Sequence, residues 1–268
     1  MSRQGLLQEV DELLALLGGN TLARLGAIPW ASPVVSFGNP LTSKLATIGL
    51  NPSNLEFMDA SGLPLEPENR FETLQSLRLT DWTNRAAVEV GKVWWSCEHY
   101  FRHRPYDRWF RPLDKVLSGL GVSYYREDAS ACHLDLVPFA TGKKWANLDS
   151  HDRSDLIRLG VPSLVRTIKA SNVRVLVLNG SGVVKTFEQL IDGRPLLRRR
   201  VPKWSLCDGR VEGYAYSGYV ASLRGMKLGR ELLVLGFNHN IQSSFGVTNG
   251  VVGGISRWVA RQAAREIA

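Results

Sequence analysis

The sequence has few residues of the kinds that form covalent cross-links or metal sites. Among 268 residues there are three cysteines and five histidines. Cys97, Cys132 and Cys207 are odd in number and share no short spacing, which argues against a disulfide framework and against a cysteine-only zinc or iron–sulfur site. We therefore expect buried free thiols, no metal and no cofactor.

Long hydrophobic runs are also missing. No apolar run reaches the roughly 18 residues that a helix needs to cross a bilayer. The N-terminal segment has acidic residues within its apolar pattern and lacks the apolar core of a signal peptide. It predicts an amphipathic helix with leucines at Leu6, Leu7, Leu13, Leu14, Leu16 and Leu17. The expectation is a cytoplasmic protein without membrane contact.

What the chain does have is positive charge. The formal net charge is +8, with 44% hydrophobic and 22% charged residues. The hydrophobic share is ordinary for a globular protein with a substantial core. The surplus of cations favours a polyanionic partner, nucleic acid above all, although charge alone is weak support. No obligate protein partner is predicted.

Four short apolar runs rich in β-branched residues predict buried parallel strands. They are 44–50, 131–137, 173–178 and 232–237. Helical patterns lie between and after them, at about 106–120, 154–170, 183–191 and 253–267, and Pro162 is expected to break or restart the second of these. This alternation predicts an α/β fold: a three-layer α/β/α sandwich with a central, mostly parallel four-stranded sheet.

Two stretches exceed what this scheme needs. Residues 69–105 predict a helical insertion with a Trp94-Trp95 pair, and residues 192–230 predict a second insertion. The second contains the basic run Arg198-Arg199-Arg200 and an extra strand over 214–223. Without a low-complexity linker or an internal repeat, the chain is expected to be a single domain, residues 1–268, with these insertions.

Ligands of open α/β sheets bind beyond the carboxyl ends of the strands. The residues at the four ends are Asn51-Pro52-Ser53, Asp135 to Pro138, Asn179-Gly180 and Asn238-His239. Three of these four ends carry polar groups that are awkward to bury. This recurrence is the strongest functional signal in the sequence.

Gly49-Leu-Asn-Pro-Ser53 directly follows the first predicted strand. It resembles the first motif, G-[IM]-N-P-G, of the mismatch-specific and single-strand-selective branches of the uracil-DNA glycosylase superfamily. The resemblance implies that Asn51 positions the water that attacks the sugar C1′, and that Pro52 and Ser53 lie near a DNA phosphate. The alternative is a plain strand-to-loop turn, because Asn-Pro is a common turn signal.

The last strand ends in Gly236-Phe-Asn-His-Asn-Ile-Gln-Ser-Ser244. The second motif of the superfamily, H-P-S-P-x, also follows its last strand, and His239 matches the histidine. The resemblance implies a hydrogen bond from His239 to O2 of the leaving base, which stabilises the negative charge that develops there. The alternative is a surface or capping histidine. The prolines are missing, and Ser243 stands where some members have an apolar wedge, so Ile241 or Phe245 would have to wedge instead.

Between these motifs lies Cys132-His-Leu-Asp-Leu-Val-Pro-Phe139. The single-strand-selective branch has N-x-x-P here, and its Asn recognises uracil; in this chain the matching residue is Asp135. A carboxyl group suits cytosine, since one oxygen accepts from the N4 amino group and a shared proton reaches N3. The alternatives for Asp135 are a helix cap or an ion pair with Lys143 or Lys144.

The resemblance also implies further contacts. Phe57, Leu65 and Asn238 are expected at the base, and the DNA contacts are expected to be Pro52, Ser53, Lys143, Lys144, Asn240, Gln242, Ser243 and Ser244. The segment from Tyr100 to Arg111 interleaves arginines with aromatic residues, which suits either phosphate contacts or packing of an inserted helix. Arg198–Arg200 and Lys203 fit a DNA backbone or a solvated loop.

The resemblance implies a monofunctional DNA glycosylase. The expected substrate is a flipped-out cytosine derivative, such as the glucosylated hydroxymethylcytosine of phage DNA, which one anti-phage branch of the superfamily removes. One alternative is a repair glycosylase for uracil, hypoxanthine or mismatched thymine. Another is a nucleic-acid-binding module without catalysis. A nucleotide-cofactor enzyme is disfavoured, because the chain lacks G-x-G-x-x-G after its first strand and has no P-loop.

Overall fold

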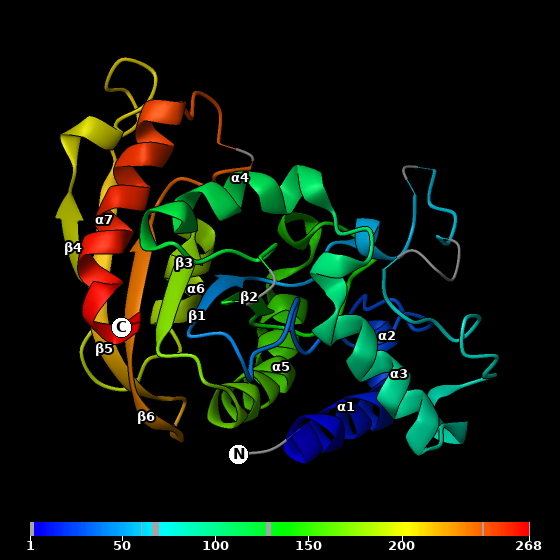
Figure 1. Ribbon diagram of the computed structural model, residues 1–268. Helices are drawn as coiled ribbons and strands as arrows, with labels where there is room; N and C mark the ends of the chain where they lie inside the picture. Colours follow the sequence, from blue (N-terminus) through cyan, green and yellow to red (C-terminus); the bar gives the residue numbers. More distant parts are fainter. Residues whose placement is uncertain (1–2, 60, 66–69, 127–129, 243, 268) are drawn as a thin grey trace. The chain divides into compact units, whose positions relative to one another are not determined.

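The computed structural model describes residues 3–59, 61–65, 70–126, 130–242 and 244–267. Six strands form one mixed sheet in the order β2-β1-β3-β6-β5-β4 (Figure 1). Their bounds are β1 Leu45–Gly49, β2 Ala131–Asp135, β3 Val175–Asn179, β4 Leu197–Arg200, β5 Tyr214–Leu223 and β6 Met226–Phe237. The fold is therefore α/β.

The apolar runs form strands where the sequence predicts them. β1 pairs with β3 and β3 pairs with β6, both in parallel. Every residue of β1, β2 and β3 is buried, as expected of strands covered on both faces. The strand predicted over 214–223 is confirmed as β5.

The sheet has six strands instead of four because the second insertion extends it. β5 pairs antiparallel with β6, and β4 pairs antiparallel with β5. Only the last six residues of β6 are uniformly buried, and its first half alternates in burial beside β5. The apolar run 232–237 therefore predicted only the inner end of this strand.

Seven α-helices lie among the described residues. They are α1 Arg3–Leu17, α2 Asn20–Arg24, α3 Ala87–Glu98, α4 Asp107–Leu117, α5 Ser150–Ala170, α6 Ser181–Glu188 and α7 Asn249–Ile267. Short 3-10 turns that matter below are η1 Asn54–Glu56 and η6 Pro202–Trp204. The N-terminal amphipathic helix is confirmed as α1, although its Leu16 stays 41% exposed.

Pro162 does not break its helix as predicted, because α5 runs through it without interruption. A proline inside a helix removes one backbone hydrogen bond. Here Gly160, Val161, Ser163 and Leu164 on either side of it are all buried, so packing of the helix holds the turn together.

Two compact units make up the chain. Unit 1 comprises Met1–Leu41, Leu50–Pro105 and His133–Ser171, and unit 2 comprises Thr42–Gly49, Tyr106–Cys132 and Asn172–Ala268. In unit 1, α1 packs on α3 and α5, and Arg166 of α5 forms an ion pair with the buried Glu9 of α1. In unit 2, α6 and α7 both pack on β3 and β6, and α4 packs on α7.

No helix in the described ranges is both long and apolar enough to cross a membrane. The three cysteines are free thiols, with Cys97 and Cys132 buried as predicted and Cys207 partly exposed. Burial raises the pKa of both Cys97 and Cys132 to about 12, so neither is a thiolate at neutral pH.

Candidate functional site

The first predicted motif lies at the start of a loop in unit 1. The Leu50 carbonyl accepts a hydrogen bond from the Val137 N–H at 3.0 Å, which joins this loop to the segment that follows β2. Asn51 Nδ2 donates to the carbonyl oxygens of Pro52 at 3.1 Å and Phe139 at 3.3 Å, and to Thr141 Oγ1 at 3.1 Å. Because carbonyl oxygens only accept, these partners fix the orientation of the amide and leave Oδ1 as its acceptor for a ligand.

Asp135 ends β2 in the same unit, and its side chain is 2% exposed. Its Oδ1 lies 3.3 Å from Nε2 of the buried His133. Two backbone hydrogen bonds between His133 and Phe37, at 2.8 and 2.9 Å, hold this end of the strand. Among the described residues no ion pair joins Asp135 to Lys143 or Lys144, both of which are exposed.

A second buried carboxyl group belongs to Glu56, which the sequence reasoning did not select. Ser53 Oγ accepts from the Leu55 N–H at 3.2 Å and so caps η1, whose last residue is Glu56. Tyr100 Oη donates to Glu56 Oε2 at 2.8 Å, and Arg70 Nε lies 3.6 Å from the same oxygen. Glu56 is 3% exposed.

The environment of Glu56 changes its acidity. Burial raises the pKa of Glu56 to about 7, Arg70 and Tyr100 oppose the rise, and the negative charge of Asp135 adds to it. Burial penalises a carboxylate that has lost its water, and a nearby like charge increases the penalty. Glu56 is therefore half protonated near neutral pH and close enough to Asp135 to interact with it.

Aromatic side chains surround these carboxyl groups. Phe71 stacks on Phe57 and on Tyr100, with ring centroids 5.6 and 5.0 Å apart, and Phe37 packs edge-on against His133 at 5.3 Å. Phe57, predicted at the base, is 1% exposed, whereas Leu65 is half-buried and donates its N–H to the Phe57 carbonyl at 2.8 Å. Asn51, Glu56, Phe57 and Asp135 thus all belong to unit 1, where Glu56 and Asp135 interact with each other.

One close contact fixes the segment that follows Asp135. A Cβ atom on Gly160 of α5 would lie 2.7 Å from the Leu136 carbonyl oxygen and 2.8 Å from the Val137 Cα. Only a glycine allows α5 to approach this backbone so closely. The position of the chain after Asp135 therefore depends on Gly160.

The second predicted motif lies in unit 2 and is tightly hydrogen-bonded. Asn179, at the end of β3, accepts from the Ile241 N–H at 3.2 Å and donates to Gln242 Oε1 at 2.7 Å. Gln242 Nε2 donates to the Trp109 carbonyl at 3.0 Å, and Asn240 Oδ1 accepts from the Gln242 N–H at 3.0 Å. These polar groups build the loop, because Asn179, Asn240 and Gln242 each make at least one hydrogen bond within it.

Asn238 is similarly engaged. Its Oδ1 accepts from the Tyr214 N–H at 2.7 Å, and its Nδ2 donates to the Glu212 carbonyl at 2.8 Å. The amide thus ties the end of β6 to the chain entering β5. Ser244 donates its N–H to the Asn240 carbonyl at 2.8 Å, and Ser243 lies outside the described residues.

His239 is buried, at 2% exposure, rather than on the surface. Its Nε2 lies 2.7 Å from the Trp204 carbonyl oxygen. Because that oxygen only accepts, Nε2 carries the hydrogen, and Nδ1 of the neutral ring is an acceptor. Burial lowers the pKa of His239 below 6.5, although the bond to Trp204 opposes this. A hydrogen bond from Nδ1 to a base would therefore require the protonated ring.

The two wedge candidates differ in exposure. Ile241 is 8% exposed, whereas Phe245, in the loop before α7, is 89% exposed. Of the two, Phe245 is available to insert between bases. In the segment from Tyr100 to Arg111, Tyr100 and Phe110 are buried, which favours packing over stacking for these two rings.

Within the described ranges, no three His, Cys, Asp or Glu side chains lie close enough together to hold a metal ion. No model of a known protein family matches the chain, and no curated protein matches it either.

Proposed function

We propose that the protein is a monofunctional DNA glycosylase that removes a cytosine-derived base, with glucosylated hydroxymethylcytosine in phage DNA as the preferred candidate. The observation that carries the proposal is the buried pair of Asp135 and Glu56 in the unit that also holds Asn51. The three-layer sandwich and the superfamily membership implied by the motifs belong to the same proposal.

The geometry of Asn51 supports a role in holding water. Both hydrogens of its Nδ2 are directed at protein oxygens, so Oδ1 is the group left to accept a hydrogen from water. A water that donates to Oδ1 keeps a lone pair for attack on C1′. The C1′–N1 bond then breaks, and its electron pair passes to the leaving base.

The carboxyl pair supports recognition and departure of a cytosine-type base. One oxygen of Asp135 accepts from the N4 amino group, and a proton held by the pair reaches N3 as the base leaves. Glu56 can supply that proton near neutral pH because burial raises its pKa to about 7. The proton lost by the attacking water returns to the pair, which restores the starting state.

A nucleic-acid-binding module without catalysis is the second candidate. It is favoured by the bond between His239 Nε2 and the Trp204 carbonyl, because this bond takes up the hydrogen that a neutral ring would donate to the base. Retained DNA affinity without abasic sites in any DNA would support this candidate. Repair of uracil, hypoxanthine or mismatched thymine is the alternative among glycosylases.

The test is to incubate the purified protein with phage genomes that carry different modified bases and to identify the released bases by mass spectrometry. We expect release of a modified cytosine and none of unmodified cytosine. Release of uracil alone would refute the assignment to cytosine derivatives.

The variant Asp135→Asn sharpens the test, because an amide suits the edge of uracil. It should lose release of the cytosine derivative and gain release of uracil from uracil-containing DNA. The matched control is Asp149→Asn, which changes an exposed carboxyl group of the same unit. Equal behaviour of the two variants would show that Asp135 does not recognise the base.

A further inference from the structure

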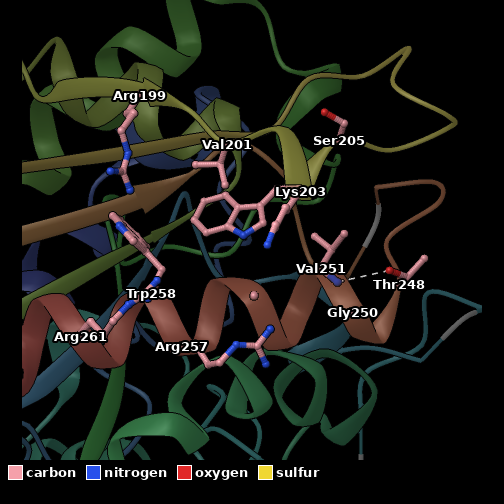
Figure 2. A pocket seen from close by; sticks show the side chains of 12 residues that line it. Arg199, Val201, Lys203, Ser205, Thr248, Gly250, Val251, Arg257, Trp258 and Arg261 are labelled. Carbon is pink, nitrogen blue, oxygen red and sulfur yellow. Dashed lines mark hydrogen bonds between the residues drawn. The ribbon is translucent and has the colours of Figure 1, made fainter.

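A cavity of about 570 Å³ lies in unit 2 between η6 and the first half of α7. Its volume is in the range typical of small-molecule sites. Figure 2 shows Lys203 directed from η6 toward α7, and Arg199 directed toward Trp258. The cavity holds none of the residues that the motifs single out.

The charged side chains that line the cavity are all cationic. They are Arg199, Lys203, Arg257 and Arg261. Among the described residues none of the four forms an ion pair. Arg257 and Arg261 are one helical turn apart on α7 and therefore share a face. Cations gathered around a concavity without a carboxylate attract an anion.

The sequence of β4 explains why only one arginine of its basic run reaches the cavity. Side chains alternate between the two faces of a strand. The Arg198 guanidinium lies over the Tyr214 ring at 3.7 Å, and Arg200 Nε is 2.8 Å from Glu212 Oε1. Arg199, between them, turns to the opposite face and lines the cavity.

Tryptophans and glycines shape the cavity wall. Trp204 and Trp258 pack edge-on with ring centroids 5.5 Å apart, and both line the cavity. A Cβ atom on Gly254 of α7 would lie 2.9 Å from Trp204 Nε1, and one on Gly213 would lie 2.4 Å from the Trp204 Cβ. Gly254 therefore packs closely against the indole of Trp204, and Gly213 packs against its Cβ and backbone.

We infer that this cavity binds a nucleotide, with its phosphate on the four cations and its sugar or base against the tryptophan wall. A single phosphate would leave most of the volume empty, and an uncharged ligand would leave the cations unused. Two sources share this chemistry, a unit of a nucleic acid strand and a free mononucleotide. The inference stands on the cavity alone and does not depend on base excision.

Trp204 connects the cavity to the predicted motif that contains His239 in unit 2. Trp204 lines the cavity with its side chain, and its backbone carbonyl accepts from His239 Nε2. An occupant that shifts Trp204 would therefore alter the hydrogen bond of His239. Binding of a ligand in the cavity should therefore shift the imidazole NMR resonances of His239. Binding of a ligand to cations far from Trp204 would leave these resonances unchanged.

The experiment measures fluorescence anisotropy of a labelled, unmodified single-stranded oligonucleotide with the full chain. The cavity variant is Arg257→Gln/Arg261→Gln. Its matched control is Arg210→Gln/Arg265→Gln, which removes the same charge from exposed positions of unit 2 outside the cavity lining. All four arginines are exposed, so both double variants are expected to fold.

The cavity variant should bind at least about tenfold more weakly than the control. Because the cavity holds one phosphate, the slope of log K against log salt should fall by at most about 0.7, the value for one phosphate contact of a single strand. Competition with deoxycytidine monophosphate separates the two sources. If the mononucleotide binds in the control but not in the cavity variant, while oligonucleotide binding is equal in both, the ligand is a free nucleotide.

Two outcomes would overturn the inference. One is equal weakening of every probe by both double variants, which would mean diffuse attraction by net charge. The other is displacement by inorganic phosphate as effective as that by the mononucleotide, since the tryptophan wall would then contribute nothing. A negative result in the glycosylase assay would not affect the interpretation of these binding measurements, because the oligonucleotide carries no modified base.

Discussion

The two units differ in the sign and the burial of their notable charged groups. In unit 1 the notable charged groups are buried carboxyls, Glu56 and Asp135, held by Tyr100, Arg70 and His133. In unit 2 they are exposed cations around an open cavity. The energy of a buried carboxyl group depends on whether it is protonated, and therefore on pH. The attraction of exposed cations for an anion depends instead on ionic strength. Near neutral pH the stability of the protein should therefore depend on the protonation of Glu56 in unit 1, whereas its affinity for anions should depend on salt through the cations of unit 2.

The largest expected effect comes from Glu56→Gln. The folded-state pKa of Glu56 is raised from 4.5 to about 7, so its stabilising protonated form is lost as pH rises through this window. Wild-type stability should fall by about 3 kcal/mol between the two values, and the variant should lack this decline. Chemical denaturation at pH 5 and pH 8 measures the difference, with the exposed Glu231→Gln as the control.

The same variant tests the proposed proton donor. Excision by the wild type should decrease as pH rises through about 7, because Glu56 then loses its proton. Glu56→Gln should be slow throughout and should lack this decrease. A variant that keeps the wild-type pH profile would assign the proton to another group.

The next effect in size concerns Gly160→Ala. Its added methyl group would meet the Leu136 carbonyl oxygen at 2.7 Å, where backbone cannot yield easily. We expect a loss of about 2 kcal/mol in the free energy of unfolding. Gly142→Ala is the control, since no atom lies within 4 Å of its added Cβ. Equal melting temperatures for the two variants would contradict the close approach of α5.

The smallest effect is expected from Phe245→Ala. Phe245 is 89% exposed, so its removal should leave stability unchanged. If it wedges the duplex, excision from double-stranded DNA should fall about fivefold while excision from single strands changes little, because a single strand needs no unstacking. Val88→Ala, at a position 60% exposed, is the control. Equal losses on both substrates would exclude the wedge.

The sequence predicted the elements whose signal is local. β1, β2 and β3 follow from apolar runs, and β5 from its own pattern of residues. β4 was missed because every residue of Leu197–Arg200 is exposed and the strand exists through pairing with β5. Pro162 was misjudged because tertiary packing outweighs the lost hydrogen bond.

The residues of the candidate site likewise fall into those that the local sequence predicts and one that it does not. Asp135 ends β2 and Asn51 lies two residues after β1, so their position was predictable, whereas their roles stay predictions. Glu56 was missed because its burial depends on Arg70 and Tyr100, which lie in another part of the chain. Its flanking Leu55 and Phe57 were the only local sign that this charged residue enters the core.

The alternation along β4 has a consequence for how the chain can change. Deleting or inserting a single residue before Arg199 would shift the pairing register of β4 by one residue. Each side chain of the strand would then face the opposite side of the sheet, since neighbouring side chains face opposite ways. Arg198 and Arg200 would then turn toward α7 and lose Tyr214 and Glu212, while Arg199 would turn outward. Chain length at this edge, more than the number of arginines, determines which guanidinium the cavity receives.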